Sequence, residues 1–149
     1  HNQRITSLEA SSGSGSSAPA SNVAFRVGGG LTTNQQLAVG DVLNFSSVTL
    51  CYPPTAFNTT TKKFTVPVAG VYMFGYKLFQ NSPDNNMRIS LKVNGNIVAT
   101  TGSKGDAAEN LTTIIECAVG DVIHVECIYG GGAVFMSSEH SWFYGHLLF

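Results

Sequence analysis

Aromatic residues alternate with other residues in the segment 64–78, FTVPVAGVYMFGYKL. Tyr72, Phe74 and Tyr76 are two residues apart, and this spacing puts their rings on one face of a β-strand. The opposite face carries three more apolar side chains, those of Val71, Met73 and Phe79. A strand that is apolar on both faces has to be covered on both sides, by a second sheet or by another subunit. The segment therefore predicts a strand of a β-sandwich that assembles with copies of itself.

Short β-like runs punctuated by Gly, Pro and Asn continue to the end of the chain, and no helical pattern occurs after residue 22. The expected strands are Val23–Val27, Val42–Leu50, Lys63–Val66, Gly70–Gln80, Met87–Val93, Ile97–Thr101, Leu111–Ala118, Val122–Tyr129, Ala133–Met136 and Ser141–Phe149. Asn94-Gly95 supplies the positive φ angles of a tight hairpin. The sequence thus predicts an all-β, ten-stranded jelly-roll sandwich over residues 23–149.

The first 22 residues differ from the rest in composition. Residues 1–10 hold Ile5 and Leu8 between charged neighbours, which indicates the end of a helical coiled-coil stalk. Residues 11–22, SSGSGSSAPASN, have no side chain able to hold a core and predict a flexible linker. The pentapeptide Ala-Val-Gly-Asp-Val occurs at 38–42 and at 118–122 without repeated flanks, so we interpret it as one kind of turn used twice.

Charged residues make up only 11% of the chain, and its net charge is -1. The eight Lys and Arg residues never cluster beyond Lys62-Lys63, so there is no basic field to attract nucleic acid. No apolar run approaches the length that inserts into a membrane. No nucleophile elbow, Cys-His signature or phosphate loop is found, and we expect no enzyme activity. The abundance of Ser, Thr, Asn and Gly favours a neutral polar surface.

The aromatic segment also carries a family resemblance. The spacing Phe-x5-Gly-x-Tyr-x-Phe-x-aromatic is formed by Phe64, Gly70, Tyr72, Phe74 and Tyr76. This spacing resembles that of the complement C1q globular-head family, within the tumour necrosis factor-like jelly-roll superfamily. Further segments resemble that family's hairpin, Gly-Asp turn and closing strand, and they are 93–95, 119–121 and 141–148. One departure is that Cys51 stands where the family has an acid or an amide, with Phe57 one residue late.

The resemblance implies a secreted homotrimer. The closing strand is apolar on both faces, and together with the aromatic segment it offers more aromatic surface than one small sandwich readily holds. We therefore expect the surplus to lie between subunits, at Tyr72, Phe74, Tyr76, Tyr129, Trp142 and Tyr144. The alternative is a monomer with a wide core.

Ligand binding is expected on loops, because a rigid sandwich holds them in place. Three loops are candidates, 81–86, 102–110 and 137–140, and a solvated turn is the alternative for each. Their polar side chains suit sugar hydroxyls or a protein ligand, the candidates being Asp84, Asn85, Asn86, Lys104, Asp106, Glu139 and His140. Tyr129 and Trp142 are candidates for stacking on a sugar, or else core residues.

Two pairs of residues are candidates for a metal site. Some heads in the resembled family hold calcium near the trimer apex, which implies a role for Asp106 and Glu109 if three subunits pool their carboxylates. His124 and Glu126 share one strand face, a geometry that suits a metal ligand pair, although a surface ion pair is the simpler interpretation.

Cysteines and sequons bear on the compartment. Cys51, Cys117 and Cys127 are odd in number, and we expect Cys117 and Cys127 to be buried free thiols placed diagonally in a hairpin. Asn44, Asn58 and Asn110 each begin an N-glycosylation sequon, which supports an extracellular location.

The sequence thus predicts a lectin-like pattern-recognition protein of innate immunity, binding glycans through loops of a homotrimeric head. Two rivals stay open. One is a receptor-binding signalling or organiser ligand of the tumour necrosis factor-like type, and the other is a structural trimerising head of a fibre.

Overall fold

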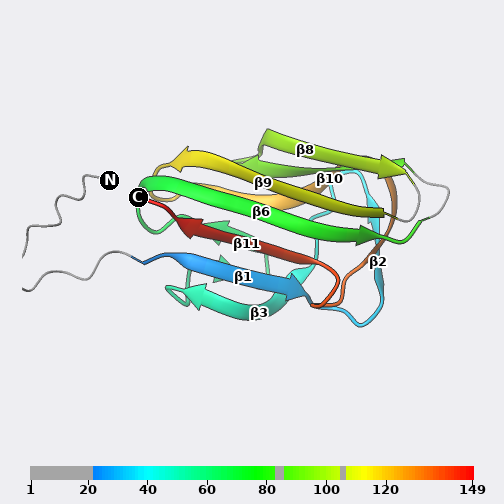
Figure 1. Ribbon diagram of the computed structural model, residues 1–149, viewed down its shortest axis with the longest axis horizontal. Coiled ribbons are helices and arrows are strands. Elements are labelled where there is room, and N and C mark those ends of the chain that lie inside the picture. The colour runs from blue at the N-terminus through cyan, green and yellow to red at the C-terminus, as the bar shows by residue number, and fades with distance from the viewer. Residues whose placement is uncertain (1–21, 83–85, 105–106) are drawn as a thin grey trace, which may run out of the picture.

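The computed structural model describes residues 22–82, 86–104 and 107–149 (Figure 1). The predicted stalk, 1–10, and almost all of the predicted linker, 11–22, lie outside the described residues. The strands are β1 (Ala24–Gly29), β2 (Asn34–Ala38), β3 (Phe45–Tyr52), β4 (Phe57–Asn58), β5 (Lys63–Thr65), β6 (Gly70–Gln80), β7 (Asn86–Val93), β8 (Asn96–Lys104), β9 (Ala107–Cys117), β10 (Val122–Phe135) and β11 (Trp142–Leu147). Among these residues no helix is long and apolar enough to cross a membrane.

The strands form two packed layers, in which every pairing is antiparallel. Sheet A has the order β3-β1-β11-β6-β9, and sheet B has the order β8-β7-β10-β5-β4. The long strand β10 joins them, because its first half pairs with β7 and its second half pairs with β2 and touches β6. Figure 1 shows sheet A in front of β10. The predicted all-β jelly roll is confirmed.

The strand count differs from the prediction in two ways. The segments 122–129 and 133–136, predicted as separate strands, are one continuous β10 that runs through Gly130–Gly132. The short strands β2 and β4 were not predicted. The predicted β7–β8 hairpin is present, with φ angles of 52° at Asn94 and 84° at Gly95.

The core between the sheets contains the aromatic residues of one chain. Tyr72, Phe74 and Tyr76 are 0%, 0% and 1% exposed, so their predicted place between subunits is wrong. Sheet B covers that face of β6, and the rings pack in contact with it. Phe25 stacks on Phe64 with centroids 4.3 Å apart, and both lie in the same cluster as Phe74. One sandwich therefore holds more aromatic volume than the sequence argument allowed.

The repeated pentapeptide folds into the same turn at both positions. Asp41 Oδ2 accepts from the backbone N–H of Ala38 at 2.9 Å, and Asp121 Oδ2 accepts from that of Ala118 at 2.8 Å. The glycine of each copy has a positive φ, 97° at Gly40 and 91° at Gly120. This confirms that one kind of turn is used twice.

The second copy connects the two sheets, so it is not a hairpin turn. β9 pairs with β6 in sheet A, whereas β10 pairs with β7 in sheet B. Cys117 and Cys127 therefore lie in different sheets, and their predicted diagonal placement in a hairpin is wrong. Both are buried free thiols, as predicted, and Cys51 is a half-buried free thiol. Burial, helped by the charge of Asp121, raises the pKa of the Cys117 thiol to about 11.

Candidate ligand-binding groove and assembly face

The described parts of the three predicted loops lie at one end of the sandwich, opposite the end where β1 begins and β11 ends (Figure 1). Only parts of them are described: Asp84, Asn85 and Asp106 lie outside the described residues, as does the side chain of Lys104. The segment 102–110 is mostly strand, because β8 continues to Lys104 and β9 begins at Ala107. Its prediction as a loop is therefore wrong.

The segment 137–140 is a turn, as predicted. Glu139 is exposed, but His140 is held in place from two sides. Its Nδ1 lies 2.6 Å from Ser137 Oγ, and its ring stacks on Phe135 with centroids 4.4 Å apart. The imidazole of His140 therefore has a structural role in the turn, which leaves Glu139 as the exposed polar side chain of this candidate pair.

An open groove of about 350 Å³ lies on the outer side of sheet B, close to the same end. Its lining residues are Asn86, Met87, Arg88, Gly102 and Tyr129, and we call it the Arg88 groove. Three of them form one row across the sheet, since Tyr129 of β10 pairs with Arg88 of β7, which pairs with Gly102 of β8. Small-molecule sites typically have volumes of about 300–1,000 Å³. The groove is thus large enough for one sugar ring.

The cation of the groove lies against an aromatic ring. The Cζ atom of Arg88 is 4.5 Å from the ring centroid of Tyr129, whose side chain is 50% exposed. A guanidinium over an aromatic face is attracted by the ring quadrupole. No carboxylate within the described part of the chain forms an ion pair with Arg88. The groove therefore offers a positioned cation, a half-exposed ring and the amide of Asn86.

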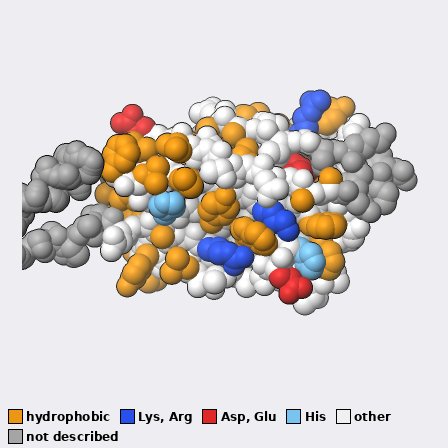
Figure 2. Space-filling model, viewed as in Figure 1, with side chains coloured by type: hydrophobic (Ala, Val, Ile, Leu, Met, Phe, Trp, Pro, Cys, Tyr) orange, Lys and Arg blue, Asp and Glu red, His pale blue; other side chains and the backbone are white. Residues whose placement is uncertain are grey.

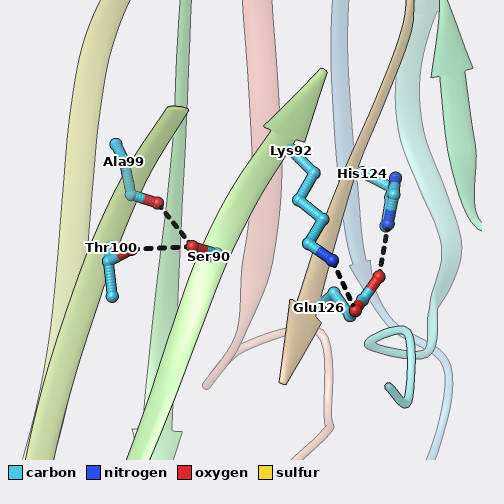
Figure 3. A network of polar contacts seen from close by, with 6 residues as sticks. All are labelled: Ser90, Lys92, Ala99, Thr100, His124 and Glu126. Atoms are coloured by element: carbon cyan, nitrogen blue, oxygen red, sulfur yellow. Dashed lines mark hydrogen bonds and ion pairs between the residues drawn. The ribbon is translucent and has the colours of Figure 1, made fainter. Parts of the chain in front are cut away.

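Further along the outer side of sheet B lies a network of polar contacts, drawn in Figure 3. Glu126 accepts from Lys92 Nζ at 2.7 Å through Oε2 and lies 2.9 Å from His124 Nε2 through Oε1. Burial alone would raise the pKa of Glu126, but the bonds from Lys92 and His124 outweigh it and hold that pKa below its ordinary value. His124 and Glu126 are in contact, as the sequence indicated, but His124 is only 5% exposed, so the pair does not lie on the surface as expected. Among the described residues no cluster of three potential ligands surrounds it.

A second network is buried in the sandwich and involves a predicted calcium ligand. Glu109 is 4% exposed and lies within β9, so it is not the loop carboxylate that the sequence predicted. Its Oε1 accepts from Thr101 Oγ1 at 2.7 Å, and Thr101 in turn lies 2.7 Å from the hydroxyl of Tyr76. Glu109 therefore belongs to an internal chain of hydrogen bonds. Its predicted partner Asp106 lies outside the described residues.

The outer face of sheet A, which we call the sheet A face, exposes several large apolar side chains. Figure 2 looks onto it and shows hydrophobic side chains gathered toward the end where the chain terminates. The large exposed ones on or beside this face are Leu50 (50%), Tyr52 (59%), Ile114 (60%), Leu148 (37%) and Phe149 (67%). Two predicted interface residues, Trp142 and Tyr144, are half-buried among them.

The middle of the sheet A face holds a tryptophan between two cations. Arg26 Cζ is 4.9 Å and Lys77 Nζ is 4.8 Å from the Trp142 ring centroid. The Tyr144 hydroxyl is 2.9 Å from Thr112 Oγ1. These contacts fix both rings before any partner binds. Tyr129 lies on the other sheet, so the structure separates it from Trp142 and Tyr144, with which the sequence grouped it.

Sequence reasoning found Asn86 and Tyr129 but missed Arg88 and Gly102. Arg88 alternates with apolar residues along its strand, as the polar residues of any half-exposed strand do, so nothing in the sequence singles it out. The signal that singles it out is its register against Tyr129 and Gly102. That register depends on which strands pair, and a single sequence does not reveal it.

The three sequons lie in different surroundings. Asn58 is exposed, and its Oδ1 accepts from the N–H groups of Thr60 and Thr61. Asn44 is half-buried beside β2, where Gln35 Oε1 accepts from its backbone N–H. Asn110 is exposed on β9 opposite Lys77, on the sheet A face. A glycan at Asn110 would therefore occupy the edge of that face.

A family model described as the C1q domain matches residues 24–148. The fold is similar to that of the globular domain of zebrafish complement 1qA protein, with 17% sequence identity and a TM-score of 0.68 over 85% of this chain and 98% of that one. It is also similar to Eiger TNF from S. frugiperda (13% identity, TM-score 0.68, 86% of this chain and 93% of that one). Murine APRIL at pH 5.0 gives 10% identity and a TM-score of 0.68, over 85% of this chain and 99% of that one. No curated protein sequence matches the chain.

Proposed function

Because the chain belongs to the C1q domain family, we propose that it is a secreted, non-enzymatic recognition head that assembles as a homotrimer and binds glycans. Domains of this family and of the related tumour necrosis factor-like ligands form trimers and bind protein ligands. Membership of the family does not by itself imply glycan binding, secretion or a role in innate immunity, so these proposals rest on the residues of this chain.

The sheet A face supports the assembly. It combines half-buried aromatic residues with large apolar side chains that are up to 67% exposed. Exposed apolar patches rimmed by polar residues mark interaction sites. A closed ring of three copies would cover such a face in every subunit without leaving a copy of it open. In this trimer Trp142 and Tyr144 are interface residues, whereas Tyr129 stays outside.

The Arg88 groove is the observation that carries glycan binding. Its row of Tyr129, Arg88 and Gly102 gives a ring, a donor and open space side by side. Sugars are bound by hydrogen bonds to their hydroxyls together with contacts to aromatic rings. Three such grooves in one trimer would bind a repetitive glycan far more tightly than one groove does.

Calcium is a separate part of the proposal. Glu109 is engaged by Thr101 inside the sandwich, so an apical calcium ion would depend on Asp106 and its two copies. A calcium ion prefers six or more oxygen ligands, which three carboxylates could supply together with water. Glycan binding is therefore measured both with calcium and with EDTA, and the proposal of calcium is discarded if the two results agree.

The test is a glycan array probed with purified trimer, whose mass is first determined by light scattering. Binding to a defined set of sugars supports the lectin function. A trimer that binds no sugar, with or without calcium, but binds a cell-surface receptor would favour the receptor-ligand alternative. A trimer that binds neither would favour a structural fibre head, and a monomer at micromolar concentration would contradict the assembly.

A further inference from the structure

We propose that the Arg88 groove selects sugars that carry a carboxylate, with Arg88 as the residue that binds the anion. This inference rests on the proposed glycan-binding function and names the sugar class for its site. It is argued from the placement of Arg88, the shape of the groove and the distribution of charge around it.

A β-bulge places the ring and the cation side by side. Val125 and Cys127 are buried on the inner side of β10, and strict alternation would put Tyr129 inside with them. The register of β10 against β7 shifts between Cys127 and Tyr129, so Tyr129 instead faces outward and pairs with Arg88. Bulges are a common means of re-aiming one side chain. The outward turn of Tyr129 thus creates the stack on Arg88.

The stack holds the guanidinium in place, and no described residue uses its N–H donors. The ring of Tyr129 supports Arg88 from one side at 4.5 Å. Arg88 is itself exposed and forms no hydrogen bond or ion pair with another described residue. A planar guanidinium presents paired N–H donors that match the two oxygens of a carboxylate. A carboxylate ligand would therefore find a cation that is already oriented.

Gly102 leaves space beside Arg88. A Cβ atom at this position would lie 3.1 Å from Arg88 Cγ, so any side chain here would crowd the arginine. With hydrogen alone, β8 leaves the floor of the groove open next to Asn86. The groove of about 350 Å³ has room for a six-membered sugar ring beside the guanidinium.

The charges of the described residues around the groove favour a single carboxylate over a polyanion. The neighbouring cation on β7 is Lys92, and it is already paired with Glu126 at 2.7 Å. The chain has a net charge of -1 and no basic cluster. Polyphosphates and nucleic acids are bound by several cations acting together. A guanidinium that no described carboxylate pairs with, beside an aromatic ring, is instead suited to one acidic sugar residue at a time.

The test uses two pairs of probes that differ only in oxidation at C6: D-glucuronate against D-glucose, and D-galacturonate against D-galactose. Each is titrated into the intact protein and followed by NMR chemical shifts. We expect at least one uronate to bind, to shift the resonances of Arg88, Gly102 and Tyr129, and to bind more tightly than its neutral partner. Arg88→Gln should weaken binding by between about 10- and 100-fold, the range of a hydrogen bond to a charged group.

Three further variants separate charge from shape. Arg88→Lys keeps the charge but lacks the paired donors, so it should recover only part of the affinity. Gly102→Val should abolish binding by filling the groove. Lys63→Gln removes a cation from β5, which pairs with the beginning of β10, and it should bind as the unchanged protein does. Thermal unfolding of each variant verifies that it is folded.

The outcomes distinguish this inference from the proposed function. Array binding that is confined to neutral sugars, or that survives Arg88→Gln, would overturn the inference and leave the lectin function standing. An array with no bound sugar would overturn both. Tighter binding of a short poly-glutamate peptide than of either uronate, with the same dependence on Arg88, would also overturn the inference, because the anion would then come from a protein.

Discussion

Three side chains connect the two sheets through the middle of the sandwich. The Tyr76 hydroxyl of β6 donates to the carbonyl of Ile89 on β7 at 2.9 Å and lies 2.7 Å from Thr101 Oγ1 on β8. Thr101 in turn donates to Glu109 of β9 at 2.7 Å. Burial raises the pKa of Tyr76 despite the bond with Thr101, which keeps its hydroxyl protonated and able to donate. Buried polar chains stabilise a fold only when their members are satisfied.

Removing the central member of this chain should destabilise the protein. Thr101→Val has nearly the same shape but takes one hydrogen-bond partner from both Tyr76 and Glu109. We expect the free energy of unfolding to fall by about 1–3 kcal/mol, the penalty for a buried polar group that loses its partner. Urea denaturation measures it. The matched control is Thr65→Val on the exposed part of β5, which should change stability by less than about 0.5 kcal/mol. Equal effects of the two changes would contradict the role of this chain of bonds.

The lowered pKa of Glu126 predicts a dependence of stability on pH. A carboxyl group whose pKa is lower in the folded state stabilises the fold above its ordinary pKa of 4.5, and this contribution is lost as the pH falls through the folded value. Lys92→Met removes a main partner of Glu126, so the variant should be destabilised at neutral pH. The difference from the unchanged protein should shrink in acid.

Urea denaturation at about pH 7 and about pH 3 tests this, because the two pH values lie on either side of the ordinary carboxyl pKa. Lys63→Met removes the same charge from a residue that has no ion pair with another described residue, and it should show no such convergence. A Lys92→Met effect of the same size at both pH values would mean that Lys92 acts through the packing of its stem alone.

Burial of single residues was only partly predictable from the sequence. Alternation with apolar residues puts Arg88, Ser90 and Lys92 on the outer side of β7, where Ser90 is nevertheless buried. It could not place Tyr129, because one extra residue in β10 reverses the direction of every side chain after it. A bulge depends on pairing with another strand, so the Arg88 groove became visible only in three dimensions.

At the scale of elements, the two Ala-Val-Gly-Asp-Val turns have the same local structure but connect different strands. Each turn is held by a backbone hydrogen bond to sheet B. Gly40 N–H donates to the carbonyl of Cys127 in β10, and Gly120 N–H donates to the carbonyl of Val66, the residue after β5. The first turn positions β2 beside the end of β10, and the second carries the chain from sheet A to sheet B. Five residues were enough to predict the structure of the turn, but not which strands each turn connects.

Glycine is required in these turns for its backbone freedom. Both Gly40 and Gly120 have positive φ angles, and open space surrounds the position of a Cβ atom at each. Gly120→Ala and Gly40→Ala should each lower the free energy of unfolding by about 1–2 kcal/mol, because an L-residue is strained in the left-handed region. Asn tolerates this region better, so Gly120→Asn should cost less than Gly120→Ala. Thermal or urea unfolding measures the order, and an alanine variant as stable as the asparagine variant would contradict the strain argument.

The bounds of β10 and the presence of β2 could not be predicted from the local sequence. Gly130–Gly132 suggested a loop, yet β10 continues through them, because Gly130 pairs with β7 and the next two glycines pair with β2. Gly130 takes a positive φ of 69° within the strand. β2 itself, NQQLA, has no apolar alternation and is held by its pairing with β10. Tertiary pairing thus overrode local propensity at both places.

For the whole molecule, the two apolar faces of the aromatic segment predicted a strand of a sandwich, and the series of short β-like runs predicted the jelly roll. The prediction that the rings of the aromatic segment face a partner subunit was wrong. Tyr72, Phe74 and Tyr76 are buried in the interior of one chain, whereas Trp142 and Tyr144 lie half-buried on the sheet A face. The number of aromatic rings that fit inside one sandwich depends on how they pack against one another, and amino-acid composition does not reveal this packing.

The proposed trimer gives a prediction that a pair of matched variants can test. Ile114 and Ile97 are 60% and 55% exposed and lie on edge strands of different sheets, β9 and β8. Ile114→Lys puts a charge on the sheet A face, where desolvating it between subunits would be costly. We expect Ile114→Lys to shift the protein toward monomers in light scattering, whereas Ile97→Lys should leave the trimer intact.

Both substitutions replace an exposed side chain, so neither should change the fold of the subunit, and circular dichroism provides that control. The sequon at Asn110 offers an independent check on the same face, since a glycan there and a subunit packed over β9 compete for one space. Peptide mapping of secreted protein should therefore find Asn110 unmodified in the trimer fraction. Trimers that persist with Ile114→Lys, or that carry a glycan at Asn110, would place the assembly surface elsewhere on the molecule.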